Sequence, residues 1–221
     1  KQLFYIFFAA ICISGCKKID RLPETEITDP NFWNTEADLI SATNRLYQQL
    51  PGDWIDTRAD DVVGQNTNLV STGARGITAT SGDWSDRYAE IFTSNNILEK
   101  GSKAKVTDAI RNRYFGEARF FRAYSYFKLL RAFGDVPLLL KTLNVNSPEL
   151  KMGRTPRAEV VQQIYDDLDF AAQWLPKRAD LPVAQYGRVT KSTAWALKAE
   201  WDCMKVPAAN FMAMLPTGRI I

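Results

Sequence analysis

The segment from Thr107 to Phe133 constrains the fold most strongly, because its apolar residues recur at helical spacing without staying on one stripe. One row contains Ile110, Tyr114, Ala118, Phe121 and Ser125, and another contains Phe120, Tyr124, Phe127 and Leu130. A helix that is apolar on more than one side lies between neighbours that cover those sides. The segment therefore predicts a helix sandwiched between other helices.

The other periodic segments predict further helices, so the expected fold class is all-α. Each is bounded by residues that start or stop a helix, such as Asn34 or Thr35 as a cap and Pro51 as a stop. Helices are expected at 34–50, 83–101 and 156–174 and from about residue 190, with Thr155 capping the third and a short extended run at 136–140. The result is a series of stacked helix pairs joined by long loops, as in TPR-like stacks, although no consensus repeat of about 34 residues is present.

The first fifteen residues have the organisation of a secretory signal. Lys1 supplies a basic flank, and residues 3–13 (LFYIFFAAICI) form an uncharged run that is too short to span a bilayer as a mature helix. The sequence ISGC at residues 13–16 looks like a bacterial lipobox, in which the cysteine thiol carries diacylglycerol. We therefore expect residues 1–15 to be a lipoprotein signal peptide and Cys16 to be lipidated. The alternative is an ordinary signal peptide with an incidental cysteine.

Residues 16–30 are expected to form a lipidated tether. Pro23, Pro30 and the alternating charges of this stretch oppose a helix and favour an extended arm. Lys17, in the second mature position, fits onward sorting to the outer membrane. More than one acyl chain on Cys16 would make the attachment stable, because each buried methylene contributes about 0.8 kcal/mol.

The stretch 53–83 is rich in Gly, Asn, Thr, Ser and Asp, and we expect a long loop with short strands or turns. Loops of this length inside a domain are uncommon unless they are functional. The flat apolar face of Trp54 could stack on a pyranose ring while polar neighbours bond the hydroxyl groups. The candidate ligand-binding residues are Trp54, Asp53, Asp61, Asn66 and Arg75, with Trp84 and Arg87 at the far end of the loop.

Core packing is the alternative role for the tryptophans, and exposed aromatic residues are often incidental. Those on or next to helical segments are expected to pack in the core. They are Trp33, Trp84, Trp174 and Trp195.

Composition excludes several function classes. The chain has no histidine, which excludes histidine-based triads and histidine-bound zinc, and we expect no metal and no cofactor. The 28 basic and 25 acidic residues are spread along the chain and give a net charge of +3, so nucleic acid is not an expected partner.

Adjacent carboxylates offer a poor basis for catalysis. The pairs Asp60 with Asp61 and Asp166 with Asp167 have the residue types of a glycosidase, but neighbouring residues point different ways on a helix. A glycoside hydrolase needs two carboxyl groups that face each other across a bond. We expect these residues to be solvated surface charges and assign no catalytic residue.

Five segments resemble the SusD/RagB family, in the family's order. They are IDRLPETEITDPNFWNTEADL (19–39), WSDRYAEIFTSNNILE (84–99), GEARFFRAYSYFKLLRAFGDVPLLL (116–140), RTPRAEVVQQIYDDLDFAAQWLP (154–176) and GRVTKSTAWALKAE (187–200). The third is the most specific. With the lipobox-like ISGC, they cover most of residues 13–200, and we expect 31–200 to be a SusD-like N-terminal helical domain.

The resemblance implies an α-helical surface lipoprotein with TPR-like units. Such a protein is anchored by lipid in the cell outer membrane, faces the exterior and sits as a lid on a SusC-like TonB-dependent transporter, to which it delivers glycans. Some family members bind peptides, so a peptide-binding RagB-like uptake protein is the second hypothesis. A surface lipoprotein hydrolase is a distant third.

Residues 201–221 (WDCMKVPAANFMAMLPTGRII) depart abruptly from the family's pattern. Codons that encode this tail can also encode, in another frame, MGLYEGTRRKLYGYAANWQDH, which looks like the family's next segment. We therefore expect a frameshift or sequencing error near Glu200, an aberrant tail at 201–221, and a helical stack that is truncated relative to the longer family members.

Cys16→Ala should release the protein from the membrane fraction, because it removes the only thiol in the lipobox-like sequence. Fractionation after metabolic acyl labelling measures both location and lipidation. Acyl label that persisted in the Cys16→Ala protein would refute lipidation at this residue.

Overall fold

The structure, a computed structural model, describes residues 32–48, 50, 69, 72–74, 76 and 80–205. The expected signal peptide and tether, most of the stretch 53–83 and the tail beyond residue 205 lie outside the described residues. The helices belong to one unit, residues 33–221.

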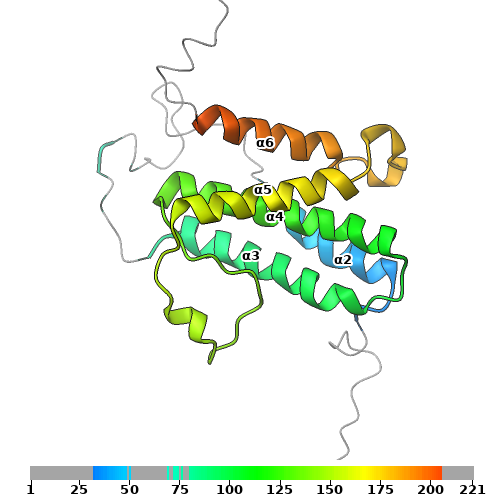
Figure 1. Cartoon of the computed structure of the whole chain (residues 1–221), viewed down its shortest axis with the longest axis horizontal. Coiled ribbons are helices and arrows are strands. Elements are labelled where there is room, and N and C mark those ends of the chain that lie inside the picture. Colours follow the sequence, from blue (N-terminus) through cyan, green and yellow to red (C-terminus); the bar gives the residue numbers. More distant parts are fainter. Residues whose placement is uncertain are drawn as a thin grey trace, which may run out of the picture. The chain divides into compact units, whose positions relative to one another are not determined.

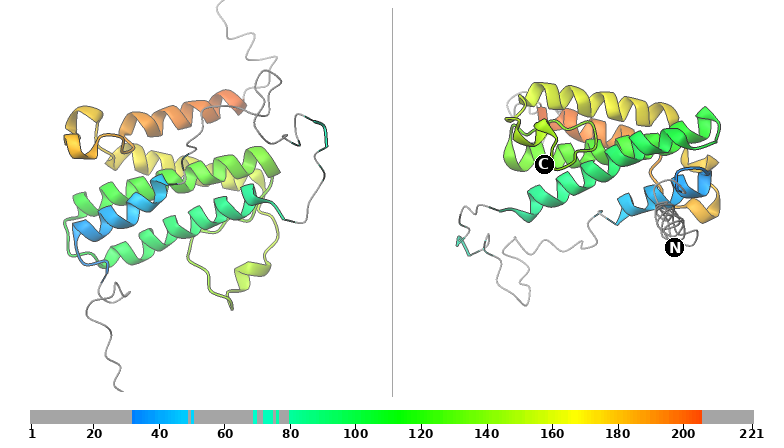
Figure 2. Two further views of the ribbon diagram at one scale, coloured as in Figure 1. Left: turned by 180° about the vertical axis from the view of Figure 1, so that it is seen from behind. Right: turned by 90° about the horizontal axis from the view of Figure 1, so that it is seen from below.

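Within the described residues, five α-helices follow one another along the chain (Figure 1). They are α2 (Glu36–Tyr47), α3 (Gly82–Lys100), α4 (Asp108–Phe133), α5 (Arg157–Trp174) and α6 (Lys191–Lys205). Helix α4 packs against α3 on one side and α5 on another, α5 carries α6, and α2 contacts both α3 and α4. Figure 2 shows the same succession of helices from two further sides. The all-α class and the stacking of successive helices are confirmed.

Helix α4 is the central element, as its apolar pattern predicts. Its buried residues point in every direction around the helix and include Tyr114, Phe121, Tyr126 and Phe127, which are almost completely enclosed. Rings add oriented contacts, since Phe120 and Phe121 meet edge to face with centroids 5.4 Å apart. Burial of large side chains on more than one face explains why one helix can organise the whole stack.

The helix starts follow from capping chemistry. Thr35 caps α2, because its hydroxyl accepts from the Asp38 amide while the Asp38 carboxylate accepts from the Thr35 amide at 2.8 Å. Thr107 caps α4 by accepting from the Ile110 amide at 3.4 Å. Gly134 ends α4 with a φ of 70°, a conformation that favours glycine.

Helix α2 ends at Tyr47, three residues before the predicted end at Leu50. The reason is Pro51, whose ring would clash with the carbonyl four residues earlier, which belongs to Tyr47. A proline also disfavours helical geometry in the residue before it, here Leu50.

The prediction that Thr155 caps α5 is wrong. Helix α5 starts at Arg157 without a side-chain cap. Thr155 instead forms an isolated antiparallel bridge with Val136, and its hydroxyl accepts from the Leu138 amide at 3.1 Å. Pairing with a distant extended segment therefore takes the hydroxyl that a cap would need.

The predicted extended run continues as segment 137–142, which is held by side chains of the neighbouring helices. Tyr88 donates to the Pro137 carbonyl at 2.8 Å. Tyr126 both donates to the Leu139 carbonyl and accepts from the Leu139 amide. Among the described residues there is no strand, so these contacts replace the partners that a sheet would provide.

A buried arginine joins three helices. Arg122 of α4 donates from Nε and Nη2 to the two carboxylate oxygens of Asp167 in α5, each at 2.7 Å, and from Nη1 to the Asn95 side chain of α3 at 2.9 Å. All three residues are buried. Asn95 in turn donates to the carbonyls of Leu139 and Lys141 at 3.0 and 3.1 Å, so the extended segment belongs to the same network.

Gly101 follows α3 where the chain lies against α2 and α4. A Cβ atom at this position would lie 2.9 Å from the ring of Phe115 and 3.1 Å from a methyl group of Leu39. The first distance is shorter than Cβ atoms tolerate and the second is tight, so the Phe115 ring or the Leu39 side chain would have to shift. Glycine is favoured here by volume and not by backbone conformation, since its φ of −62° suits any residue.

Helix α6 continues five residues beyond Glu200, as far as Lys205. Trp201 is buried and meets Phe127 of α4 edge to face, with centroids 5.4 Å apart. The expectation of a changed reading frame near Glu200 stays a prediction, which the nucleotide sequence decides. Across the described part of the chain, no helix is both long and apolar enough to cross a membrane.

Arg122→Met should lower the free energy of unfolding by about 3 kcal/mol, because it breaks a buried ion pair. Removal of one partner of a buried pair costs about 3–5 kcal/mol. The effect should stay near the lower end of that range, because Arg119 remains 3.8 Å from Asp167. Urea unfolding monitored by circular dichroism measures the change, with the slope checked for constancy.

Arg131→Met is the matched control. Arg131 pairs with Glu200 across 3.8 Å at the surface, and the loss of an exposed pair changes stability by about 0–1 kcal/mol. Equal stability of the two variants would contradict the central role of Arg122.

Candidate functional site

Two of the seven candidate ligand-binding residues, Trp84 and Arg87, lie in the described part of the chain. Both are in the first turns of α3, directly after the stretch 53–83. The other five lie outside the described residues, and they are Asp53, Trp54, Asp61, Asn66 and Arg75. The structure therefore defines one edge of the predicted site.

Trp84 belongs to a cluster of rings at the start of α3 and the end of α4. Its ring centroid lies 5.0 Å from that of Tyr88 and 5.1 Å from that of Phe133, the latter edge to face. The guanidinium carbon of Arg154 lies 5.6 Å from the centroid of Trp84. Trp84 is half-buried, so it shares packing contacts with an exposed part that a ligand could reach. We call Trp84, Tyr88, Phe133 and Arg154 the Trp84 cluster.

The backbone turn after α4 positions Arg154. Its Nη1 donates to the carbonyls of Phe133 and Asp135, at 2.9 and 3.0 Å. The Phe133 carbonyl belongs to the last residue of α4 and that of Asp135 lies just beyond it, where intrahelical donors run out, and a cation there is also favoured by the helix dipole. Arg154 remains exposed although it is held in place.

Arg87 faces the interior of the helix pair. Its Nη1 lies 2.6 Å from both carboxylate oxygens of Glu90, which is buried. Ser125 of α4 donates to the same carboxylate at 2.6 Å. Burial raises the pKa of Glu90, while Ser125 and Arg87 act in the opposite direction. Arg87 therefore has a structural partner already, and a ligand would share it.

Tyr88, Phe133 and Arg154 were not among the residues predicted from the sequence. Tyr88 could have been found, because it lies four residues after Trp84 and on the same face of α3. Phe133 and Arg154 come from the end of α4 and from the approach to α5, and no local pattern connects them with Trp84. Only the packing of α3 on α4 and the bridge at Thr155 bring them together.

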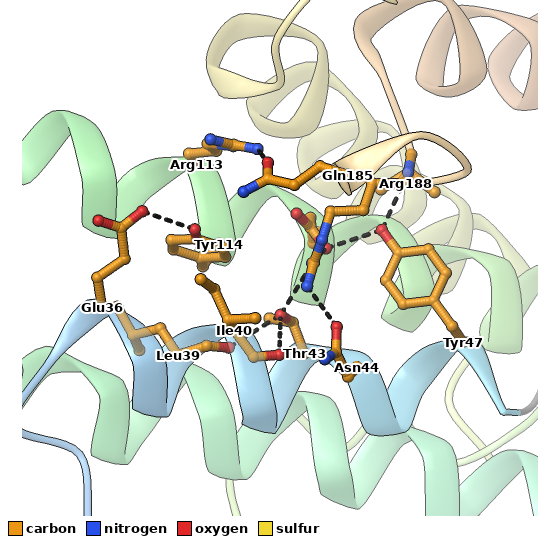
Figure 3. A network of polar contacts seen from close by, with 12 residues as sticks. Glu36, Leu39, Ile40, Thr43, Asn44, Tyr47, Arg113, Tyr114, Gln185 and Arg188 are labelled. Atoms are coloured by element: carbon orange, nitrogen blue, oxygen red, sulfur yellow. Dashed lines mark hydrogen bonds and ion pairs between the residues drawn. The ribbon is translucent and has the colours of Figure 1, made fainter. Parts of the chain in front are cut away.

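A second polar cluster joins α2, α4 and the segment before α6 (Figure 3). Arg188 donates to the buried Glu117 carboxylate at 2.6 Å and to the Thr43 hydroxyl at 3.2 Å, and it also bonds the Asn44 side chain. Tyr47 donates to the same oxygen of Glu117 at 2.8 Å and accepts from the Val189 amide at 2.9 Å.

The groups of this second cluster are saturated by one another. Burial raises the pKa of the Glu117 carboxyl group, while the nearby Arg188 and the hydrogen bond from Tyr47 oppose that rise. Figure 3 also shows Tyr114 donating to Glu36, at 2.8 Å. The cluster thus fixes α2 and the segment before α6 on α4, and it offers a ligand few free polar groups.

The buried carboxylates of the described residues are each held by an arginine. Glu90 pairs with Arg87, Glu117 with Arg188, and Asp167 with Arg122. The expectation that Asp166 and Asp167 are both solvated is wrong for Asp167, which is fully buried, and right for the exposed Asp166. The two neighbours do point different ways, as expected for adjacent residues on a helix.

The expectation of core packing holds fully for Trp33, is met in part by the half-buried Trp84 and Trp174, and fails for Trp195. Trp195 is 58% exposed, whereas Trp33 is buried. Helix α6 packs through the stripe formed by Ala194, Leu197 and Trp201, and Trp195 lies beside that stripe.

Comparison with known proteins identifies the family. Residues 42–200 match a family model described as SusD-like, "Starch-binding associating with outer membrane". The chain belongs to the SusD-like family. The match contains every helix from α3 to α5, the second half of α2 and most of α6.

Relatives and solved structures agree with this family. A SusD-like protein of Formosa agariphila is 26% identical over 205 residues, which cover 84% of this chain and 39% of that protein. A SusD-like protein of Bacteroides ovatus is 28% identical, covering 89% of this chain and 37% of the relative. A crystal structure of a SusD-like protein from Bacteroides fragilis superimposes with a TM-score of 0.69 at 25% identity, over 84% of this chain and 38% of the other. The chain thus spans less than two fifths of the length of these relatives.

Proposed function

We propose that this SusD-like chain is the helical part of a surface lipoprotein that captures glycans at the outer membrane and delivers them to a SusC-like TonB-dependent transporter. The observation that carries the proposal is the family match over residues 42–200. The family's description combines starch binding with association with the outer membrane. A structural neighbour from Bacteroides fragilis, 25% identical with a TM-score of 0.62, is described as a SusD-like carbohydrate binding protein.

The proposed capture site combines the stretch 53–83 with the Trp84 cluster. Trp54 would stack on a sugar ring, and the polar residues would bond hydroxyl groups; they are Asp53, Asp61, Asn66, Arg75 and Arg87. The Trp84 cluster supports this location, because a half-buried indole beside an exposed, positioned guanidinium presents the combination that carbohydrate recognition needs. The rigid helices behind the cluster would hold the site without reorganisation.

The proposed anchoring places the helical domain outside the cell. Cys16 would carry the lipid, residues 16–30 would form the tether, and residues 31–200 would form the binding domain. Capture outside the membrane would then precede delivery to the transporter. Residues 201–221 have no assigned part in the proposed function.

Trp54→Ala should weaken glycan binding by tenfold or more, because it removes the stacking platform. A tenfold rise in Kd corresponds to a loss of about 1.4 kcal/mol of binding free energy. Trp84→Ala should weaken it less, since Trp84 also packs against Phe133. Isothermal titration calorimetry with starch-derived and laminarin oligosaccharides measures both effects, after a glycan array and a peptide library have ranked ligands.

Trp195→Ala is the matched control, because Trp195 is exposed and belongs to α6, which contributes no residue to the proposed site. It should leave the affinity unchanged. Binding to peptides in place of glycans would favour the RagB-like alternative. An unchanged affinity in both Trp54→Ala and Trp84→Ala would contradict the location of the site.

A further inference from the structure

The connection between α4 and α5 contains an ordered projection that the capture site does not use. Residues 143–153 leave the helices, turn through the short 3₁₀-helix η2 (Pro148–Lys151) and return to Thr155 (Figure 1). We call residues 143–153 the protrusion. It stands away from the helices in Figure 1 and again when the molecule is seen from behind in Figure 2.

Both ends of the protrusion are fixed to the helical stack. Before it, the Thr142 amide donates to the Glu99 carboxylate of α3 at 2.8 Å, and the Thr142 hydroxyl bonds the same carboxylate. After it, the Thr155 amide donates to the Val136 carbonyl at 3.1 Å. Both ends of the protrusion are therefore fixed. The segment that leads into it, residues 137–142, is itself held by Asn95 and Tyr126.

The protrusion is also ordered internally. The Ser147 amide donates to the Asn144 carbonyl at 2.9 Å, and the Asn144 amide donates to the Ser147 hydroxyl at 2.9 Å. Lys141 lies 2.5 Å from the Glu149 carboxylate, which ties the ascending side to η2. A loop that is already ordered loses little conformational entropy when a partner binds.

Apolar side chains occupy the outside of this ordered loop. Val145 is 90% exposed, Leu150 is 57% exposed and Met152 is 38% exposed. Surface aliphatic residues are ordinary when they are scattered singly, whereas these three share one short, fixed projection. Methionine adapts to irregular surfaces, which suits such a site.

The chemistry of the protrusion favours a protein partner over a lipid surface. Val145 lies between Asn144 and Asn146, and the Glu149 carboxylate lies next to Leu150 in η2. Immersion of amides and a carboxylate in hydrocarbon is costly, whereas protein interfaces combine apolar cores with polar rims. Lys141 is paired with Glu149, which leaves Lys151 as the exposed charge of η2, so a partner with an acidic rim is complementary.

We propose that the protrusion is a docking element that inserts Val145, Leu150 and Met152 into an apolar groove, edged by carboxylates, on a partner protein. Under the proposed function, on which this identification of the partner rests, the groove belongs to the outside of the SusC-like transporter. Docking through the protrusion leaves the Trp84 cluster free for the glycan, because the two use different side chains of the α4–α5 connection.

The test measures binding of the chain to the purified SusC-like transporter in detergent micelles by biolayer interferometry. The double variant Val145→Ser with Leu150→Ser should bind about tenfold more weakly or worse, as expected when central apolar contacts are lost. Val183→Ser is the matched control, because Val183 is 77% exposed in the 3₁₀-helix η4 (Val183–Gln185), outside the protrusion. It should bind as the unmodified chain does.

Charge provides an independent arm of the test. Lys151→Glu should slow association and weaken its dependence on salt, because it reverses a charge facing the proposed acidic rim. Lys103→Glu, at an exposed lysine of the 3₁₀-helix η1 (Gly101–Lys103), is the control for net charge.

The possible outcomes separate this proposal from the proposed function. Equal binding of the double variant and the unmodified chain would overturn docking through the protrusion while leaving delivery intact. Absence of any binding to the transporter would overturn docking and delivery together, but not glycan capture, which calorimetry tests separately. Binding to phosphatidylethanolamine–phosphatidylglycerol vesicles that the double variant loses would assign the protrusion to lipid. A lower melting temperature of the double variant with unchanged affinity would show that the chain itself covers these side chains.

Discussion

The guanidinium of Arg122 is the contact on which the arrangement of α3, α4 and α5 depends. Three of its nitrogen atoms bond residues of the two neighbouring helices, at Asp167 and Asn95. A buried charge needs its partners in fixed places, because a lost partner leaves an unpaired group in a medium of low polarity. Apolar side chains can slide over one another at little cost, whereas this bonded group allows one register of the three helices.

The same contact extends to the parts of the chain for which we propose functions. The side-chain oxygen of Asn95 accepts from Arg122, and its side-chain nitrogen donates to the carbonyls of Leu139 and Lys141. The buried network therefore fixes the position of the extended segment, residues 137–142. Its two ends lead to different surfaces, since the turn after α4 positions Arg154 beside Trp84 and the continuation past Thr142 begins the protrusion.

The helices could be predicted from the sequence because their caps and apolar patterns are local, lying within a few residues of one another. Thr35 and Thr107 cap the helices that follow them, and the all-round apolar pattern of α4 made its central place foreseeable. Asp167 could not be placed, because its burial depends on Arg122, which is 45 residues away. The prediction that Thr155 caps α5 was wrong for the same reason, since its partner Val136 is also distant in sequence. Of the residues in the Trp84 cluster, the sequence pointed only to Trp84 as a candidate, while Arg154 required the fold.

The enclosed backbone at Gly101 has a consequence for engineering more stable forms of this protein. Replacement of glycine by alanine near a helix commonly raises the free energy of unfolding by about 0.4–1 kcal/mol, because it lowers the conformational entropy of the unfolded chain. Gly82, in the first turn of α3, meets that expectation, because a methyl group there would have only the Asp86 carboxylate near it, at 3.9 Å. At Gly101 the same change would press on the side-chain ends of Phe115 and Leu39, which would have to shift and offset the gain. A stabilisation scheme that ranks glycines by helix propensity alone would treat these two positions as equals, although only at Gly101 would the added methyl group crowd side chains of α2 and α4.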